Sequence, residues 1–582
     1  MNKHLSPQPP EKAKVRSLIT PGRERKAKRM STKTLVSEIL RRGEEIPEKP
    51  AFVFLGSNGR RSVLTFSDVS NLSQKFAAKL RTLGISIGDV VCNMLPTSPE
   101  RVITQLGTIM AGAVFMNGQM CFADGSDFIK SLNDGRAKAF IHDPNDLNVA
   151  YQVLKNKAMP ESTEDKFVCP DVPLLRMIIP CELEMNKRTE KCLLEELYET
   201  SKKICEDIRP DSVCAYTCTS GSNTAFKLVS YTNQYLIEAG RCMGEVNGLD
   251  SNSILFNDKP FGWIVGAPGL VFAIGCTRVT VDKTVPRETG YPHVVKEALR
   301  QENCTAALTI PSFLGKIVKE IAKGQGKNDY LLRSIGVLGG PITSTVLKAI
   351  GTVAESLVLM YGSSETDIAA AMTLTRKDQE YTDFLCGWPI EGTEFRIVDS
   401  SMMDVPVGHT GEILLKKPRF SSGYVNNDKA NRETFLSDGW ISLGDRGFLN
   451  DKGQISVPGR GAHAIMRGDD VVYPIQLEAP LLQCPGLVEV LVTGVPDETH
   501  FEEICGLLVR NPNAGDEINE NYVHCFCREK LFVAAVNEKL ECKLIPKYLR
   551  FVDDIPKLRN GKVDRIAAKR LALQLVNECK PK

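Results

Sequence analysis

The sequence lacks several features that would assign it to a narrow class of protein. Its 73 basic and 71 acidic residues leave a formal net charge of only +2, so the overall charge gives no case for nucleic-acid binding. No hydrophobic signal peptide opens the chain, and the 18 cysteines do not follow the spacing of a small disulfide scaffold. We therefore expect free thiols in a reducing, intracellular compartment, with the cytoplasm as the first expectation and organelle targeting left open.

Three common catalytic or binding signatures are also missing. There is no G-x-S-x-G nucleophile elbow. The pair Gly324 and Gly326 lacks the third glycine and the preceding strand of a dinucleotide-binding turn. The cluster from His524 to Cys527 has no partner pair downstream, and its spacing predicts one face of a strand and not a zinc site.

Long hydrophobic runs are few. Two uncharged runs, residues 102–123 and 260–277, are interrupted by amide side chains, glycines or prolines, so we expect buried core elements and not membrane spans. Around them, amphipathic segments alternate with short apolar strands, an order typical of layered α/β structure with mostly parallel strands. A chain of 582 residues is long enough for two or more domains.

The first 33 residues differ from the rest in charge. They hold ten lysines and arginines against Glu11 and Glu24, with proline and glycine between them. This composition predicts a disordered basic arm over residues 1–33. A solvated tail, organelle targeting and peripheral contact with a membrane surface are all left open for it.

A run of hydroxyl-bearing residues and glycine, residues 215–227, is the candidate phosphate loop. Backbone N–H groups and hydroxyls in such a turn surround anionic oxygens, and the lysine adds a positive charge. The loop is not a Walker A motif, because Phe226 stands where that motif has glycine and Leu228 follows the lysine. A surface turn with no ligand is the alternative. The candidate contacts are Thr219, Ser220, Gly221, Ser222 and Lys227.

Two further loops follow apolar strands. One comes after residues 335–338, where an open parallel sheet has its ligand-side loops. The other follows residues 357–360 and combines an aromatic ring, a glycine, two hydroxyls and an acid, a set that predicts stacking on a base and coordination of a hard cation. A turn with a solvated glutamate is the alternative for the second loop. The candidates are Gly339, Gly340 and Pro341, then Tyr361, Gly362, Ser363, Ser364 and Glu365.

The segment from Asp438 to Glu478 contains a candidate diol site. Residues 441–445 form a strand-like approach that ends in Gly444 and Asp445, where we expect a turn that presents the carboxylate. A carboxylate accepts two hydrogen bonds at once and so suits the two hydroxyls of a ribose. Gly459 and Arg460, small residues and a second Gly/Asp turn follow, which indicates a joint between two bodies.

In this order the motifs resemble those of the adenylate-forming enzymes, the superfamily of acyl-CoA synthetases, aryl-CoA ligases, beetle luciferases and peptide-synthetase adenylation domains. The resemblance covers roughly residues 35–573. Residues 219–227 are similar to the family loop TSGSTGxPKG, and residues 361–365 to the motif YGxTE. Residues 443–445 are similar to TGD, and the segment that begins at Pro556 to the loop PKxxxGKxxR.

The resemblance implies a role for each motif. The phosphate loop holds the β- and γ-phosphates of ATP, and Glu365 holds magnesium. Tyr361 and the loop 339–341 frame adenine, Asp445 fixes the ribose, and Arg460 lies near the sugar. Lys562, in the segment from Pro556, bridges the reacting carboxylate and the α-phosphate and is the leading catalytic candidate, together with Glu365. Trp263 stands where the family places a side chain beside the acyl pocket, with a core tryptophan as the equal alternative.

The same resemblance implies the domain plan. Residues 34–459 form a large N-terminal adenylate-forming domain of layered, mostly parallel sheets and helices. Residues 460–463 form a hinge that contains Ala462, and residues 464–582 form a smaller, mobile α+β C-terminal domain.

The implied activity is ATP-dependent activation of a fatty or aryl carboxylic acid to an acyl-adenylate, followed by thioester formation with CoA. The chain is thereby identified as an acyl-CoA synthetase-like, AMP-forming acid–thiol ligase of fatty acid metabolism, with the acid, ATP, Mg²⁺ and CoA as its small-molecule partners. Transfer to another acceptor, or oxidation as in luciferases, is a further alternative.

Several residues depart from the family patterns. Thr224 and Phe226 replace a glycine and a proline of the phosphate loop, which removes a residue that readily takes positive φ and a preset backbone angle. Ala462 at the hinge and Asp469 in the second-step loop also differ, so the sequence supports adenylation better than thioester formation. The alternative is a catalytically impaired nucleotide- or acyl-binding protein on the same fold.

Overall fold

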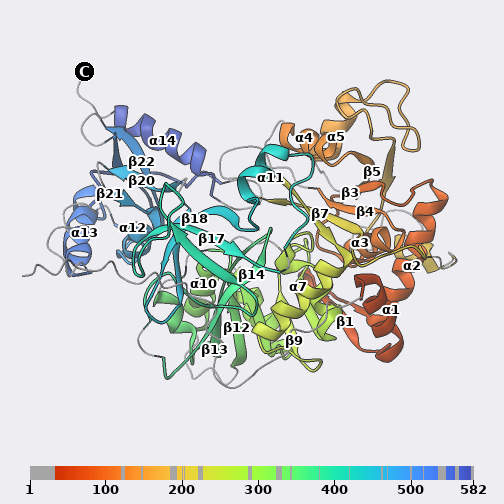
Figure 1. Ribbon diagram of the computed structural model, residues 1–582, viewed down its shortest axis with the longest axis horizontal. Helices are drawn as coiled ribbons and strands as arrows, with labels where there is room; N and C mark the ends of the chain where they lie inside the picture. The colour runs from red at the N-terminus through yellow and green to blue at the C-terminus, as the bar shows by residue number, and fades with distance from the viewer. Residues whose placement is uncertain are drawn as a thin grey trace, which may run out of the picture.

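The computed structural model describes residues 33–118, 125–145, 149–183, 193–198, 201, 204–219, 227–285, 291–322, 331–340, 342, 344–378, 381–418, 420–460, 463–467, 470–497, 501–515, 517–534, 545–557 and 563–578. Figure 1 shows a large body of sheets and helices, red to teal, and a smaller blue body that carries the C-terminal segments. The α/β class with a large N-terminal and a smaller C-terminal domain is confirmed. The domain boundaries stay a prediction, and the basic arm up to residue 32 lies outside the described residues.

One layer of the large domain is a six-stranded sheet in the order β6-β5-β3-β4-β7-β8. Its strands pair in parallel from β6 to β7, and β8 closes one edge as an antiparallel hairpin with β7. Parallel neighbours require crossover connections, which helices supply here. The elements are β3 (Val90–Asn93), β4 (Val114–Asn117), β5 (Ala137–His142), β6 (Met177–Pro180), β7 (Val213–Thr219) and β8 (Lys227–Thr232), with α2 (Phe66–Thr82), α3 (Pro99–Met110), α4 (Ser126–Asp134), α5 (Val149–Lys157) and α6 (Leu193–Tyr198).

The second layer is a thirteen-stranded sheet in the order β16-β17-β18-β19-β15-β14-β13-β12-β11-β9-β10-β1-β2. The predicted parallel strands run from β1 through β10, β9, β11 and β12 to β13, and antiparallel strands continue beyond β13. The elements are β1 (Pro50–Leu55), β2 (Arg61–Thr65), β9 (Ile254–Asn257), β10 (Thr277–Val281), β11 (Ala306–Thr309), β12 (Leu332–Val337), β13 (Ala354–Ser363), β14 (Asp367–Thr375), β15 (Leu385–Pro389), β16 (Glu394–Val398), β17 (Gly411–Lys416), β18 (Ile441–Leu449) and β19 (Ile455–Arg460), with η1 (Ser57–Gly59), η4 (Ser344–Ala349), α9 (Tyr291–Gln301), α10 (Pro311–Ala322) and α11 (Asp428–Thr434).

Helices α7 (Asn233–Val246) and α8 (Gly269–Ile274) pack against each other at glycines. A Cβ on Gly269 would overlap the Leu236 carbonyl oxygen, and a Cβ on Gly240 would overlap the Gly269 backbone. The short η3 turn (Ile264–Gly266) precedes this contact. The close approach therefore fixes the position of the segment that carries Trp263.

The two uncharged runs are core elements, as predicted, over their described parts. All of α3 is buried, as are Val114 to Met116 and most of α8. Within the described ranges, no helix has both the length and the apolar character needed to cross a membrane.

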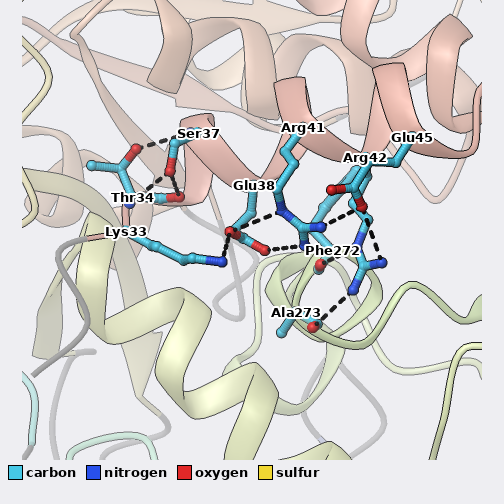
Figure 2. A network of polar contacts seen from close by, with 9 residues as sticks. All are labelled: Lys33, Thr34, Ser37, Glu38, Arg41, Arg42, Glu45, Phe272 and Ala273. Carbon is cyan, nitrogen blue, oxygen red and sulfur yellow. Dashed lines mark hydrogen bonds and ion pairs between the residues drawn. The ribbon is translucent and has the colours of Figure 1, made fainter. Parts of the chain in front are cut away.

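A polar network fixes α1 (Leu35–Glu45) to the end of α8 (Figure 2). Glu38 lies at its centre with only 2% of its surface exposed. Arg41 Nη2 and Lys33 Nζ lie 2.6 and 2.9 Å from its two carboxylate oxygens. Arg42 donates to the carbonyls of Phe272 and Ala273 at 3.2 and 3.3 Å, in the last turn of α8, where carbonyls have no partner within the helix.

Replacement of Glu38 by glutamine is expected to lower the free energy of unfolding by about 1–3 kcal/mol at neutral pH. Burial alone would raise the pKa of Glu38, but hydrogen bonds from Arg41 and Lys33 lower it below its usual value. A carboxyl with a lower pKa in the folded state stabilises the protein above its unfolded pKa and loses this effect as pH falls through the folded pKa. Thermal unfolding should therefore show a difference between wild type and variant that shrinks below about pH 4.3.

Glu45→Gln is the matched control, because Glu45 lies on the same helix and also contacts Arg41 but is 48% exposed. An exposed pair of this kind contributes roughly 0–1 kcal/mol. Equal destabilisation by both substitutions, or a Glu38→Gln effect that persists in acid, would contradict the conclusion that the buried Glu38 carboxylate stabilises the fold through its ion pairs.

The small domain is built on a sheet in the order β21-β20-β23-β22, with β24 parallel to β23. Glu478 on its first helix accepts from Arg565 Nη2 at 3.0 and 3.2 Å and from Val492 N at 3.0 Å. The predicted terminal helix from Arg565 is observed, so this ion pair joins the first and last helices. The elements are β20 (Ile465–Arg467), β21 (Asp470–Val472), α12 (Pro474–Leu481), β22 (Leu487–Asp497), β23 (Phe501–Arg510), α13 (Glu520–Ala534), β24 (Tyr548–Phe551) and α14 (Arg565–Glu578).

The strand predicted at His524 to Cys527 is wrong, because these residues lie in α13. Cys527 is buried in the core of the small domain, while Cys525 is exposed, as expected for positions on different faces of a helix. The spacing of residues over only four positions is too short to distinguish a strand from a helix.

Candidate active site

The motif from Tyr361 to Thr366 lies at the carboxyl end of β13, as predicted. A register shift between β13 and β14 at Gly362 brings the chain so close that a Cβ there would overlap the Asp367 carbonyl oxygen. Ser363 Oγ accepts from Glu365 N at 3.2 Å and holds the turn. Only glycine fits at position 362, and the residues next to it are thereby placed at the carboxyl end of β13.

Tyr361 on β13 contacts Asp445 on β18, although three strands lie between these two in the order of the sheet. Tyr361 Oη donates to Asp445 Oδ2 at 2.8 Å, and each residue is only 8% exposed. The candidate base-stacking ring and the candidate diol carboxylate are therefore parts of one buried contact.

The turn predicted at Asp445 is wrong, because Asp445 lies in the interior of β18 and pairs with Arg460 of β19. Gly444 has a φ of +74°, which accommodates a local irregularity without ending the strand. Pairing with β17 and β19 on both sides continues past the glycine and overrides the turn signal. The carboxylate is thus held by a strand and not by a flexible turn.

Glu365 is buried, with 5% of its surface exposed, and is held by one neighbouring segment. Its Oε1 accepts from Tyr424 Oη at 2.6 Å, and its carbonyl accepts from Ser421 N at 2.8 Å. The preceding Ser364 carbonyl accepts from Tyr231 Oη at 2.8 Å. The candidate metal-binding carboxylate therefore has a fixed backbone and one fixed oxygen.

The candidate phosphate loop joins β7 to β8. Thr219 and Lys227 are cross-strand partners, and Thr219 Oγ1 donates to the Lys227 carbonyl at 3.3 Å. Ser220, Gly221 and Ser222 lie outside the described residues. Both ends of the loop are therefore placed at one edge of the six-stranded sheet.

Strand β8 also bonds to the chain that carries Tyr424. Ser230 N donates to the Gly423 carbonyl at 3.0 Å, and Val425 N donates to the Leu228 carbonyl at 2.8 Å. Lys227 Nζ lies 4.7 Å from the centre of the Tyr424 ring. These contacts bring the phosphate-loop lysine beside the partner of Glu365.

Trp263 is half-buried in a segment that is tied down by buried polar groups. Thr217 Oγ1 donates to the Gly262 carbonyl, and Gln105 Nε2 donates to the Phe261 carbonyl at 3.3 Å. Arg278, fully buried, donates to the carbonyls of Asn257, Lys259 and Gly266 in the same segment. Partial exposure is compatible with the acyl-pocket role, which stays a prediction.

The remaining predicted residues are only partly described. Gly339 and Gly340 follow β12, and Gly339 has a φ of +80° that glycine adopts readily, while Pro341 lies outside the described residues. Ala462 lies outside as well, and Arg460 is placed by its backbone alone.

Lys562 lies outside the described residues, but both ends of its loop, 558–562, are placed. Lys557 pairs with Val563, and Asp564 N donates to the Pro556 carbonyl at 2.8 Å. Lys557 Nζ also binds Glu489 and Asp554 at 2.8 and 2.7 Å. These contacts fix both ends of the loop next to α14.

The electrostatics at the turn include a second acid. Burial raises the pKa of Asp367 to about 6, against the influence of the nearby Lys417 ammonium. Burial also holds the pKa of Tyr231 well above its usual value, so its hydroxyl is a neutral donor. The turn thus carries a second buried carboxyl, Asp367, whose nearby cation is Lys417.

Glu365 fits a magnesium ion that is held mainly by substrate. Among the described residues, no group of three or more His, Cys, Asp or Glu side chains could hold a metal by itself. Mg²⁺ is commonly bound by one or two carboxylates together with phosphates and waters. Glu365, a single buried carboxylate with one oxygen bonded to a hydroxyl, is compatible with this mode of Mg²⁺ binding.

Sequence reasoning missed two residues of this region. Tyr424 has no local pattern that relates it to its partner Glu365, which is 59 residues away in the chain. Arg278 lies in a strand of alternating character, and no local signal indicates which carbonyls it binds. Only the placement of the strands shows either contact.

Comparison with known proteins gives consistent matches over most of the chain. Residues 40–425 match the AMP-binding enzyme family, and residues 476–562 match the AMP-binding enzyme C-terminal domain. The 4-coumarate–CoA ligase 1 of Arabidopsis thaliana is 25% identical over 545 residues, which cover 90% of this chain and 89% of that protein.

Two solved structures share the fold. The anthranilate CoA ligase AuaEII in complex with anthranoyl-AMP superposes with a TM-score of 0.75 at 20% identity and covers 94% of this chain and 98% of its own. The O-succinylbenzoate coenzyme A synthetase MenE from Bacillus subtilis, in complex with ATP and magnesium ion, gives a TM-score of 0.72 at 18% identity and covers 93% and 100%.

Proposed function

This chain belongs to the AMP-binding enzyme family, and on that premise we propose that it joins a fatty or aryl carboxylic acid to CoA through an acyl-adenylate. The observation that carries the proposal is the arrangement around β13. Tyr361 contacts Asp445, and Glu365, four residues later, contacts Tyr424. Lys227, at the base of the phosphate loop, lies beside the Tyr424 ring. The relatives that act on 4-coumarate, anthranilate and O-succinylbenzoate support the aryl class.

The reaction has two steps with a simple balance of bonds. A carboxylate oxygen attacks the α-phosphorus of ATP, a P–O bond forms, and the bond to pyrophosphate breaks. The CoA sulfur then attacks the acyl carbon, a C–S bond forms, and AMP leaves. Because two anions must meet in the first step, catalysis depends chiefly on positioning and on neutralisation of charge.

The proposed nucleotide contacts are those that the resemblance to the family implies. Asp445 accepts hydrogen bonds from the ribose hydroxyls, Tyr361 and the 339–341 loop frame the adenine, and Arg460 lies near the sugar. The loop of Thr219, Ser220, Gly221, Ser222 and Lys227 surrounds the β- and γ-phosphates.

The proposed reaction contacts involve the metal site and the small domain. Glu365 would hold Mg²⁺, which supplies positive charge to the phosphate oxygens when bound. Lys562 bridges the reacting carboxylate and the α-phosphate, and Trp263 lines the acyl pocket. Rotation about the hinge at 460–463, with Ala462 in it, exchanges the lysine for the CoA thiol.

Turnover by the purified full-length protein tests the proposal. ATP, Mg²⁺ and a panel of fatty acids of graded chain length and aryl acids are supplied with and without CoA, and pyrophosphate, AMP and acyl-CoA are measured. We expect acid-dependent pyrophosphate release that becomes catalytic when CoA is added. Reactions without acid control for simple ATP hydrolysis.

The second candidate is a nucleotide- or acyl-binding protein that does not turn over. It is favoured by Thr224 and Phe226 in the phosphate loop and by Ala462 and Asp469 near the hinge. Binding of ATP without pyrophosphate release for any acid in the panel would select it. Acid-dependent release would eliminate it.

A further inference from the structure

Tyr424 has an unusually fixed backbone for a residue outside regular strands. Its N–H donates to Asn431 Oδ1 at 2.7 Å, and its carbonyl accepts from Asn431 Nδ2 at 2.8 Å. An isolated bridge to Val229 fixes it to β8, and its ring packs on Phe435 with the centroids 5.9 Å apart. The side chain, 7% exposed, therefore has little freedom to choose another position.

The hydroxyl of Tyr424 is the side-chain partner of Glu365. Its Oη donates to Oε1 at 2.6 Å. Among the described residues, no lysine or arginine forms an ion pair with Glu365, and no hydrogen bond reaches its second oxygen, Oε2. A buried carboxylate needs such a donor to keep its charge and its orientation. The tyrosine thus engages Oε1 and not Oε2.

The ring of Tyr424 also contacts the ammonium group of Lys227. The lysine Nζ lies 4.7 Å from the ring centre, within the range of a cation–π interaction. Lys227 is the last residue of the phosphate loop and the first of β8. One rigid side chain therefore touches the carboxylate through its hydroxyl and the ammonium through its ring.

We infer that Tyr424 is a positioning residue that sets the distance between two charged groups of the nucleotide site, Glu365 and Lys227. The hydroxyl orients the carboxylate for the divalent cation, and the ring holds the ammonium where the triphosphate arrives. The inference rests on the proposed function, because it assigns these two groups to Mg²⁺ and to ATP.

The two contacts are separable by substitution. Tyr424→Phe keeps the ring and removes the hydroxyl, so it affects the carboxylate alone. Tyr424→Leu removes both contacts, and Lys227→Met removes the ammonium while Tyr424 stays in place. Tyr231→Phe is the matched control, because it deletes another buried hydroxyl that bonds at 2.8 Å to the same turn, but to the Ser364 carbonyl and not to a carboxylate.

Calorimetric titration of the full-length proteins with ATP over a series of Mg²⁺ concentrations, and with AMP in EDTA, measures the effects without turnover. For Tyr424→Phe we expect the Mg²⁺ concentration that gives half-maximal ATP affinity to rise about tenfold, as for the loss of one hydrogen bond to a charged group. Its affinity for AMP should stay within about twofold of wild type, because AMP lacks the phosphates that share the cation.

For Tyr424→Leu and Lys227→Met we expect a further loss of about threefold to tenfold in ATP affinity even without Mg²⁺, again with AMP unaffected. Tyr231→Phe should lower the melting temperature as much as Tyr424→Phe without moving the Mg²⁺ requirement. If Tyr424→Leu does not fold, Tyr424→Phe tests the ring: because it keeps the ring, it should retain the Mg²⁺-free ATP affinity that Lys227→Met loses.

The inference is overturned if Tyr424→Phe has the Mg²⁺ dependence of wild type, or if Tyr231→Phe shifts it equally. A loss of AMP affinity parallel to that of ATP would likewise show a merely structural role. Absence of Mg²⁺-dependent ATP binding in the wild type would refute the proposed function itself, and that failure is visible before any variant is compared.

Discussion

Lys562→Ala lowers the rate of acid-dependent pyrophosphate release by about 10²–10³-fold, while the affinity for ATP changes little. The expected size is that of one preorganised donor at a developing charge, which acts in the transition state and contributes little to ground-state binding. Single-turnover measurements of pyrophosphate release, beside calorimetric titration with ATP, separate the two quantities. The contacts that fix the two ends of the loop are made by residues 556, 557, 563 and 564, so the substitution leaves them in place.

Lys569→Ala is the matched control for Lys562→Ala. Lys569 lies on α14 in the same domain, is 48% exposed and pairs with Glu502 at 2.6 Å on the surface. Its loss should leave the rate within about twofold, as for an exposed ion pair. A normal rate in Lys562→Ala, or an equal loss in Lys569→Ala, would contradict the assigned role.

Asp445→Asn weakens ATP binding by roughly 30- to 100-fold, which corresponds to about 2–3 kcal/mol for a lost charge-assisted pair of hydrogen bonds. Asparagine keeps the shape and one acceptor oxygen for Tyr361 Oη, so the buried contact at β13 survives. The change therefore falls mainly on the second acceptor, the one a ribose diol requires. Titration with ATP measures the loss.

A deoxynucleotide makes this prediction specific. Wild type should bind ATP about tenfold more tightly than 2′-deoxy-ATP, and Asp445→Asn should lose most of that preference because the partner of the missing hydroxyl is already gone. Asp404→Asn, which removes an exposed carboxylate paired with Arg396, controls for general charge. Unchanged discrimination in Asp445→Asn would place the ribose elsewhere.

Sequence reasoning correctly predicted that the motif beginning at Tyr361 stands at the end of an apolar strand. Tyr361, Gly362 and Glu365 follow an apolar run in β13, and this pattern survives without any knowledge of neighbours. The family matches and the CoA-ligase relatives confirm the predicted class of AMP-forming acid–thiol ligase. The individual roles of the site residues stay predictions.

Sequence reasoning did not predict contacts between segments that are distant in the chain. The position of Asp445 inside β18 depends on pairing with β17 and β19, which a Gly-Asp turn signal cannot reveal. The Tyr424–Glu365 contact depends on how the chain after β17 returns to β8. The error at Asp445 and the missed contact of Tyr424 both arise where tertiary pairing outweighs local preference.

The ion pair between Glu478 and Arg565 links the first and last helices of the small domain. Glu478 lies on the first helix after the predicted hinge, and Arg565 begins the helix that follows the Lys562 loop. Val492 N donates to the same carboxylate, so both helices and β22 are tied together. If the small domain rotates about the predicted hinge at residues 460–463, both placed ends of the Lys562 loop rotate with it, and the hinge angle then sets the distance of the lysine from the nucleotide site.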